Sequence, residues 1–132
     1  MTFKTLHTNI KAIIIAGGFK YIPADKWFNI ELGQFPQALV NNSFTLKFTG
    51  LSGGAKIHTM SILDIQPEFV LNAKNDIYLD VFDKAMTAVK NLKDVTIPNY
   101  GKIIVPPLAQ FSTVYFSDYV ILTFNDVKIE VK

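Results

Sequence analysis

Apolar residues near the start of the chain recur at steps of three and four. They are Phe3, Leu6, Ile10, Ile13 and Ile14. This spacing places side chains on one face of an α-helix. Gly17 and Gly18 follow, and glycine is the commonest residue just past the end of a helix. The pattern therefore predicts an amphipathic helix over residues 2–16 that packs on a sheet.

A second helical pattern covers residues 76–93. Its apolar face is formed by Ile77, Val81, Ala85, Ala88 and Leu92. Aspartates gather toward its start, and Lys90 and Lys93 lie near its end, which is the favourable arrangement for the helix dipole. Asn75 or Asp76 can cap the first turn.

Between the two helical patterns, apolar and polar residues alternate. Phe44, Leu46 and Phe48 alternate with threonine and lysine, which predicts a strand with one buried face. The chain then turns over residues 50–56 and returns as extended structure over residues 57–71, so a hairpin is expected. Because proline has no N–H to donate, Pro67 is expected to split the returning segment and to lie at an edge or a bulge.

The remaining segments complete the expected architecture. Residues 19–42 are rich in aromatic residues and interrupted by Pro23 and Pro36, which predicts an irregular segment. Residues 111–131 return to a β pattern. The order helix, strands, helix, strands predicts a single α+β domain over residues 1–132. Its sheet is expected to be mostly antiparallel, with the two main helices packed on one face.

Composition narrows the possible functions. Hydrophobic residues make up 49% of the 132 residues, a surplus that favours contact with other chains. Thirteen basic residues, all lysine, and eleven acidic residues leave a net charge of +2, which argues against a protein whose main task is to neutralise phosphates. The absence of cysteine excludes thiolate catalysis and a cysteine-based zinc site. No stretch approaches the roughly 18 apolar residues of a membrane span, so no membrane partner is expected.

The stretch GLSGGAK, residues 50–56, looks like a phosphate-binding loop. Such a loop needs a glycine directly before its lysine, a serine or threonine directly after it, and a helix that begins there. Ala55 and Ile57 occupy the two flanking positions, and strand-like sequence follows. The stretch is therefore interpreted as the tip of the hairpin, suited to ordering against a partner.

No group of residues predicts catalysis, a cofactor or a metal site. His7 and His58 are the only histidines, and neither has a ligand-forming residue at metal-binding spacing. Asp64 and Glu68 flank the expected strand break and are interpreted as solvated. The sequence also lacks the Gly-x-Ser-x-Gly turn that presents a nucleophilic serine.

Two segments are the candidate interface. One is the hairpin tip, and the other is the aromatic stretch around the single tryptophan. Aromatic residues can stack nucleobases, but core or subunit contact is favoured here because few lysines lie nearby. The candidate interface residues are Trp27, Phe28, Phe35, Gly50, Leu51, Ser52, Gly53, Gly54 and Lys56.

The order of the elements, with the segments FPQALVNNSFTLKFTG and NDIYLDVFDKAMTAVKNL, resembles the tail-terminator (tail-completion) proteins of long-tailed bacteriophages. The likeness spans nearly the whole chain and rests on pattern, length and these two segments. It implies a structural virion protein without catalytic residues.

Further expectations follow from the resemblance. The chain would form a homohexameric ring on the last ring of the tail tube and present a surface to neck or connector proteins. Genomic DNA would pass through the lumen without sequence-specific contact. The expected location is the virion, at the head–tail interface, after assembly in the host cytoplasm.

Two alternatives remain open. A head–tail joining protein of the neck would share the structural role, and binding to tail tubes or to connectors would distinguish the two. A small nucleic-acid-binding module would use the aromatic stretch and scattered lysines, and steep salt dependence of oligonucleotide binding would favour it.

Overall fold

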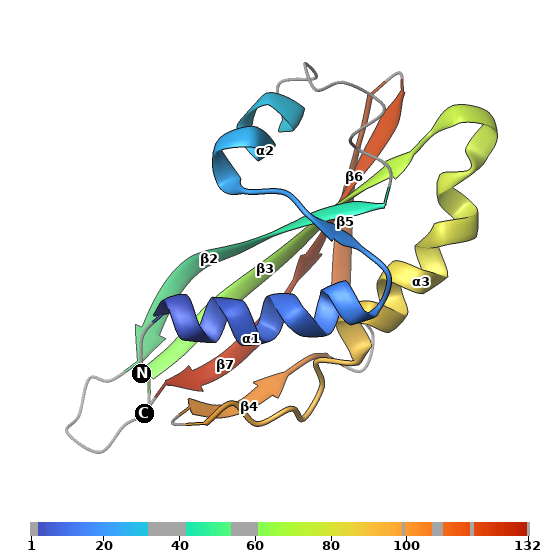
Figure 1. Cartoon of the computed structure of the whole chain (residues 1–132). Coiled ribbons are helices and arrows are strands. Elements are labelled where there is room, and N and C mark those ends of the chain that lie inside the picture. Colours follow the sequence, from blue (N-terminus) through green and yellow to red (C-terminus); the bar gives the residue numbers. More distant parts are fainter. Residues whose placement is uncertain are drawn as a thin grey trace.

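The computed structural model describes residues 3–31, 42–53, 61–98, 100–106, 110–116 and 118–131, without the side chains of residues 28–31, 52–53 and 131. Figure 1 shows the arrangement of the elements. In chain order they are α1 (Phe3–Ala16), β1 (Lys20–Tyr21), α2 (Ala24–Glu31), β2 (Ser43–Gly53), β3 (Ser61–Asn72), the 3-10 helix η2 (Lys74–Asp76), α3 (Tyr78–Lys90), β4 (Tyr100–Ile104), β5 (Gln110–Tyr115), β6 (Tyr119–Asn125) and β7 (Val127–Val131). The chain has the predicted α+β fold.

β3 is the strand around which the described sheet is built (Figure 1). On one side it pairs antiparallel with β2. On the other side its first half pairs with β7 and its second half with β6. β4 pairs with β7 and β5 with β6, while the short β1 pairs parallel with β2 at the opposite edge. The prediction of a mostly antiparallel sheet is confirmed.

The prediction that Pro67 splits its strand is wrong. β3 continues through Pro67, which lies opposite Leu46 of β2 in the middle of the sheet. On the far side, however, the ladder to β7 ends at Ile65 and the ladder to β6 begins at Glu68. Pro67 therefore lies where β3 changes partner, a position that tolerates a residue without an N–H.

The bulge that was expected at Pro67 lies instead between β6 and β7, the two strands that pair with β3 on this side. The β3 ladder shifts by one residue between β6 and β7, and the residue joining those two strands, Asp126, has a left-handed φ of 63°. One extra residue on one strand is a β-bulge, which bends and twists the sheet. A similar register shift in β2 falls between Phe48 and Gly50. Both neighbours of β3 are therefore bulged near Ile65.

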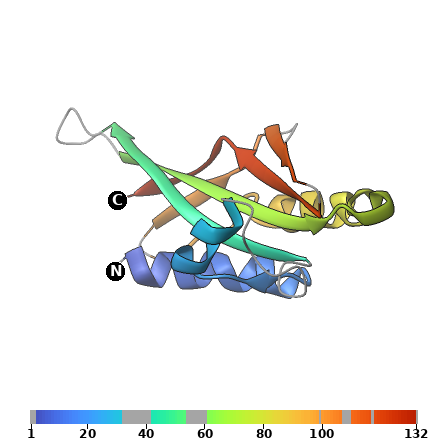
Figure 2. The same ribbon diagram turned by 90° about the horizontal axis from the view of Figure 1, so that it is seen from above.

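The two main helices pack on one face of the sheet, as predicted. Leu6, Ile10 and Ile14 of α1 join a core cluster with Ala85, Ala88 and Val89 of α3 and with inward residues of the sheet. Figure 2 shows α1 running along this face. A Cβ atom added to Gly17 would lie 3.1 Å from Cβ of Ala88, so the small residue lets the end of α1 approach α3.

The start of α3 differs from the prediction. Asn75 and Asp76 belong to the 3-10 turn before the helix, with left-handed φ values of 53° and 60°. The residue that precedes the first turn of α3 is Ile77, and no side chain caps it. The turn conformation moves both polar side chains away from the capping position, so the predicted cap is wrong.

α2 falls in the segment that was expected to be irregular. The carbonyl of Pro23 accepts a hydrogen bond from the backbone N of Trp27 at 2.9 Å, so this proline begins a helix, where its missing N–H costs nothing. Ile22 and Trp27 pack with Val70, Tyr119 and Ile121 in a second cluster. Val70 lies between Phe69 and Leu71, which face the first cluster, so α2 covers the opposite face of the sheet.

Candidate functional site

The described structure separates the predicted interface residues. Trp27 is 1% exposed, so its side chain packs in the core of the chain itself and is not a surface contact. Four other candidates, Gly50, Leu51, Ser52 and Gly53, belong to β2. They pair with β3 and form part of the β2–β3 hairpin, called the hairpin arm below, and they do not form its turn. The side chains of Phe28 and Ser52, and the whole of Phe35, Gly54 and Lys56, lie outside the described residues.

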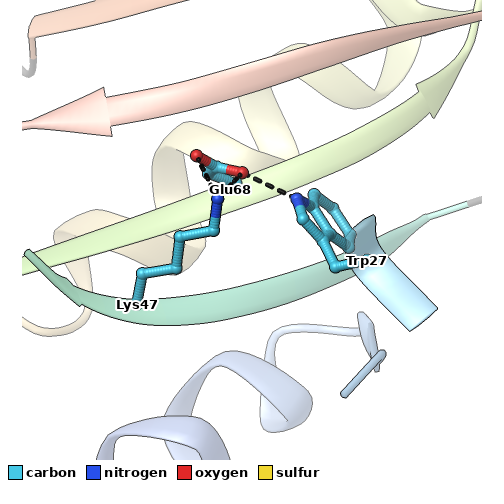
Figure 3. Close-up of polar contacts among 3 residues, drawn as sticks. All are labelled: Trp27, Lys47 and Glu68. Atoms are coloured by element: carbon cyan, nitrogen blue, oxygen red, sulfur yellow. Dashed lines mark hydrogen bonds and ion pairs between the residues drawn. The ribbon is translucent and has the colours of Figure 1, made fainter. Parts of the chain in front are cut away.

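Trp27 belongs to a polar contact on the α2 face of the sheet (Figure 3). Its indole Nε1 donates a hydrogen bond of 2.7 Å to the Glu68 carboxylate in the middle of β3. Lys47 of β2 lies 3.2 Å from the same carboxylate oxygen. The prediction that Glu68 is solvated is wrong, because the residue is 7% exposed. A carboxylate this buried needs donors and a counter-charge, which Trp27 and Lys47 supply.

This contact is better suited to structure than to catalysis. A general base must be free to take a proton from a substrate, and Glu68 already accepts from the indole of Trp27 and from the ammonium of Lys47. The neighbouring Thr45 is 1% exposed, and its hydroxyl has no hydrogen-bond partner among the residues that the structure describes. The contact therefore ties α2 to the sheet across a buried polar strip.

A shallow apolar groove lies at the base of the hairpin arm. Its volume is about 390 Å³, and its lining is formed by Phe3, Phe48, Thr49, Gly50, Leu51 and Leu63. Phe3 at the start of α1 is 51% exposed, and Leu51 on β2 is 58% exposed. The groove thus brings two predicted interface residues, Gly50 and Leu51, next to Phe3 at the start of α1. The sequence pattern did not indicate that α1 would contribute to this surface.

His7 of α1 is half-buried and packs against Phe48, one of the residues that line this groove. Its Nε2 lies 3.2 Å from the carbonyl oxygen of Leu46, and its ring packs edge-on against the rings of Tyr21 and Phe48. Burial lowers the pKa of His7 below its ordinary 6.5. The hydrogen bond with Leu46 opposes this shift, and the charge of Lys11 adds to it.

The lowered pKa of His7 predicts a pH dependence of stability. Well above pH 6.5 the imidazole is neutral in both folded and unfolded chains, so the contribution of His7 to stability is complete. As the pH falls below 6.5, the unfolded chain binds the proton first, and this contribution is lost. Urea unfolding at pH 7.5 and pH 5.5 should therefore show a larger loss of stability for wild type than for His7→Gln. An equal loss in both proteins would contradict the assignment to His7.

The edge strand β5 exposes more apolar side chains than the sequence pattern indicated. Phe111, Val114 and Tyr115 are 45%, 54% and 61% exposed. Val114 also borders a hollow of about 260 Å³ whose other lining residues are Glu68, Phe116, Ile121 and Thr123. A signal was present in the sequence, because no charged residue occurs between Lys102 and Asp118. An uncharged segment is exposed in this way only because β5 lies at the edge of the sheet, and the local sequence pattern does not reveal the strand order.

The described residues hold few other candidates for chemistry. A polar hollow of about 200 Å³ at the two bulges contains Asp64, Gln66 and Lys128, and the Asp64 carboxylate is paired with the Lys128 ammonium at 3.5 Å. Across the described parts of the chain, no three acidic or histidine side chains converge as a metal site would require. Nor is any helix there long and apolar enough to cross a membrane.

Comparison of the sequence with protein-family models and with curated proteins finds no match.

Proposed function

We propose that this chain is a structural virion subunit, a tail terminator that forms a ring, caps the tail tube and joins it to the head or neck. The observation that carries the proposal is the character of the exposed surface. Apolar side chains gather at the groove beside the hairpin arm and along β5, whereas Glu68, the buried carboxylate of the described residues, is occupied within the fold. Such surfaces suit contact with other chains.

The groove and the hairpin arm supply the kind of contact a ring requires. A closed ring uses heterologous contacts, in which one patch of a subunit meets a different patch of its neighbour. The described ends of β2 and β3 lie at one end of the molecule, beside both termini (Figures 1 and 2). The groove at the base of the hairpin arm offers Phe3 and Leu51 to a neighbouring surface.

The structure argues against the nucleic-acid-binding alternative but not against a neck or connector protein. A neck or connector protein would use the same apolar surfaces, so it remains the closest competitor. A single-stranded nucleic-acid module needs exposed aromatic rings beside free cations. Trp27 is buried and Lys47 is paired with Glu68, so the aromatic stretch loses its central stacking residue. The small net charge of +2 points the same way.

Ring formation and its dependence on the groove test the proposal. Wild-type protein should form rings with a central hole, seen by negative-stain imaging and by light scattering after size exclusion, alone or on purified tail tubes. Leu51→Lys places a charge in the apolar groove and should reduce assembly by about tenfold or more, because an unpaired ammonium resists burial.

Ile15→Lys is the matched control. Ile15 is 46% exposed at the far end of α1, so the same kind of change there should leave assembly intact. A wild-type chain that stays monomeric both alone and with tail tubes would contradict the proposal. Retained assembly in Leu51→Lys would remove the groove from it.

A further inference from the structure

β5 is an edge strand without the usual protection. It pairs with β6 on one side, and no described strand pairs with its other side. Its six residues, QFSTVY, carry no charge, and its register with β6 is regular. An exposed, regular, uncharged edge strand is a template for pairing with another strand.

The other edges of the described sheet do carry such protection. β4 contains Lys102 and has an irregular register against β7. β1 has only two residues, one of them Lys20. β2, beyond its short pairing with β1, contains the bulge near Thr49. Lysines, short strands and bulges all discourage strand addition. β5 is the edge that remains open to it.

Hydrogen bonding shows which backbone groups of β5 face outward. At the β5–β6 turn, the N–H of Phe116 donates to the carbonyl oxygen of Tyr119 at 2.8 Å. Hydrogen-bonded and non-hydrogen-bonded pairs alternate along antiparallel strands, so even-numbered residues of β5 bond to β6 and odd-numbered residues face away. The outward N–H and C=O groups therefore belong to Phe111, Thr113 and Tyr115.

The side chains of the same residues share one face of the sheet, the face covered by α3. The Phe111 ring lies 5.0 Å from the Phe82 ring, and the Tyr115 ring lies 6.0 Å from the Tyr78 ring. Both β5 rings nevertheless stay about half exposed, as do Ile77 and Leu79, which flank Tyr78 in the sequence. The open edge and an apolar surface therefore adjoin each other.

We propose that β5 pairs antiparallel with β5 of a second copy of this chain, about a two-fold axis at Thr113. In this register Thr113 faces Thr113 of the second copy, and Phe111 faces Tyr115. All three outward residues of each strand then meet outward residues. Aromatic and threonine cross-strand pairs are favourable, and the strand has no charge to repel its copy. Centring the axis on Ser112 would instead place Phe111 against Thr113 and leave Tyr115 unpaired.

This contact goes beyond the proposed function. It is isologous and closes as a dimer, whereas a ring requires contacts between two different patches. Six paired residues with their flanking side chains cover less than the roughly 800 Å² per partner of a typical stable interface. The dimer is therefore a weak one, with a dissociation constant on the order of micromolar.

Cysteine cross-linking tests the register directly. The chain has no native cysteine, so a single introduced thiol reports only on contact between copies. Opposite residues of a hydrogen-bonded antiparallel pair have Cα atoms about 5.5 Å apart, within disulfide range. Thr113→Cys should cross-link to a covalent dimer on mild oxidation at least about tenfold faster than Ser112→Cys, which lies off the axis on the opposite face.

Sedimentation provides the second test. Thr113→Lys would place two ammonium groups opposite each other and should weaken the dimer by about tenfold or more. Ile104→Lys, at an exposed position of β4, should leave it unchanged. Equal cross-linking of the two cysteine variants, or a wild-type chain that is monomeric up to about 1 mM, overturns the inference.

Ring formation by wild type and by Thr113→Lys is measured separately, by negative-stain imaging. Rings that persist in Thr113→Lys while the isolated dimer is lost would show that the β5 contact is distinct from the ring contact, as proposed. A dimer that depends on Thr113, in a chain that never forms rings even on tail tubes, would overturn the tail-terminator function and leave the β5 contact standing.

Discussion

Replacing Phe69 with alanine is expected to lower the free energy of unfolding by about 3–5 kcal/mol, the usual cost of truncating a buried phenylalanine. Phe69 is fully buried in the second half of β3. Its ring lies 4.8 Å from that of Phe19, 6.0 Å from that of Phe44 and 5.6 Å from that of Phe124. Alanine would leave a cavity among residues from the α1–β1 connection and from two neighbouring strands, which cannot all collapse into it.

Urea unfolding followed by circular dichroism measures this effect. Phe3→Ala is the matched control, because Phe3 is 51% exposed and its truncation should cost about 1 kcal/mol or less. If Phe69→Ala is too unstable to fold, Phe69→Leu retains much of the volume and should show a smaller loss in the same direction. A loss below about 1 kcal/mol for Phe69→Ala would contradict the position of this ring in the core.

The elements predicted correctly are those whose local pattern agrees with their surroundings. Leu6, Ile10 and Ile14 recur at helical steps and pack on a continuous sheet, so periodicity and burial agree. Phe44 and Leu46 alternate with Ser43 and Thr45 as a strand requires, although the expected single buried face is wrong at this point, because Ser43 and Thr45 are buried as well. In such segments sequence spacing and tertiary packing carry the same information.

Predictions failed where the outcome depended on strands distant in sequence. Pro67 suggests a strand end by its chemistry, yet it is accommodated because β3 passes from β7 to β6 beside it. Pro23 and the aromatic residues after it suggest a loop, yet they form α2 because Trp27 has the Glu68 carboxylate to bind. Neither partner is visible from the local sequence.

The outcome for the candidate interface residues also depends on whether local pattern or distant strands decide their exposure. Leu51 was predicted as a contact because it lies in the stretch interpreted as the hairpin tip, and it is exposed although it belongs to β2. Trp27 was predicted to make a core or subunit contact because it lies in the aromatic stretch, and the structure places it in the core on the α2 face of the sheet. The exposure of β5 follows from strand order, since the same sequence between two other strands would be buried.

Replacing Trp27 with alanine is the other change with a large expected effect, a loss of about 3–5 kcal/mol of unfolding free energy. Two contributions combine in it. The indole is 1% exposed within the cluster that holds α2 on the sheet, so its removal leaves a cavity. Its Nε1 also donates 2.7 Å to the Glu68 carboxylate, which would lose a donor while remaining buried.

Intermediate variants separate the two contributions of Trp27. Trp27→Phe keeps an aromatic ring but removes the donor, so its cost should be about 1.5–3 kcal/mol, the range for a hydrogen bond to a charged group. A double-mutant cycle with Glu68→Gln should show coupling between the indole and the carboxylate. The cycle of Lys47→Met with Glu68→Gln should show about 1 kcal/mol or less, because the Lys47 side chain is 32% exposed and water screens its charge. Stronger coupling to Lys47 than to Trp27 would mean that the ion pair, and not the indole, holds Glu68 beneath α2.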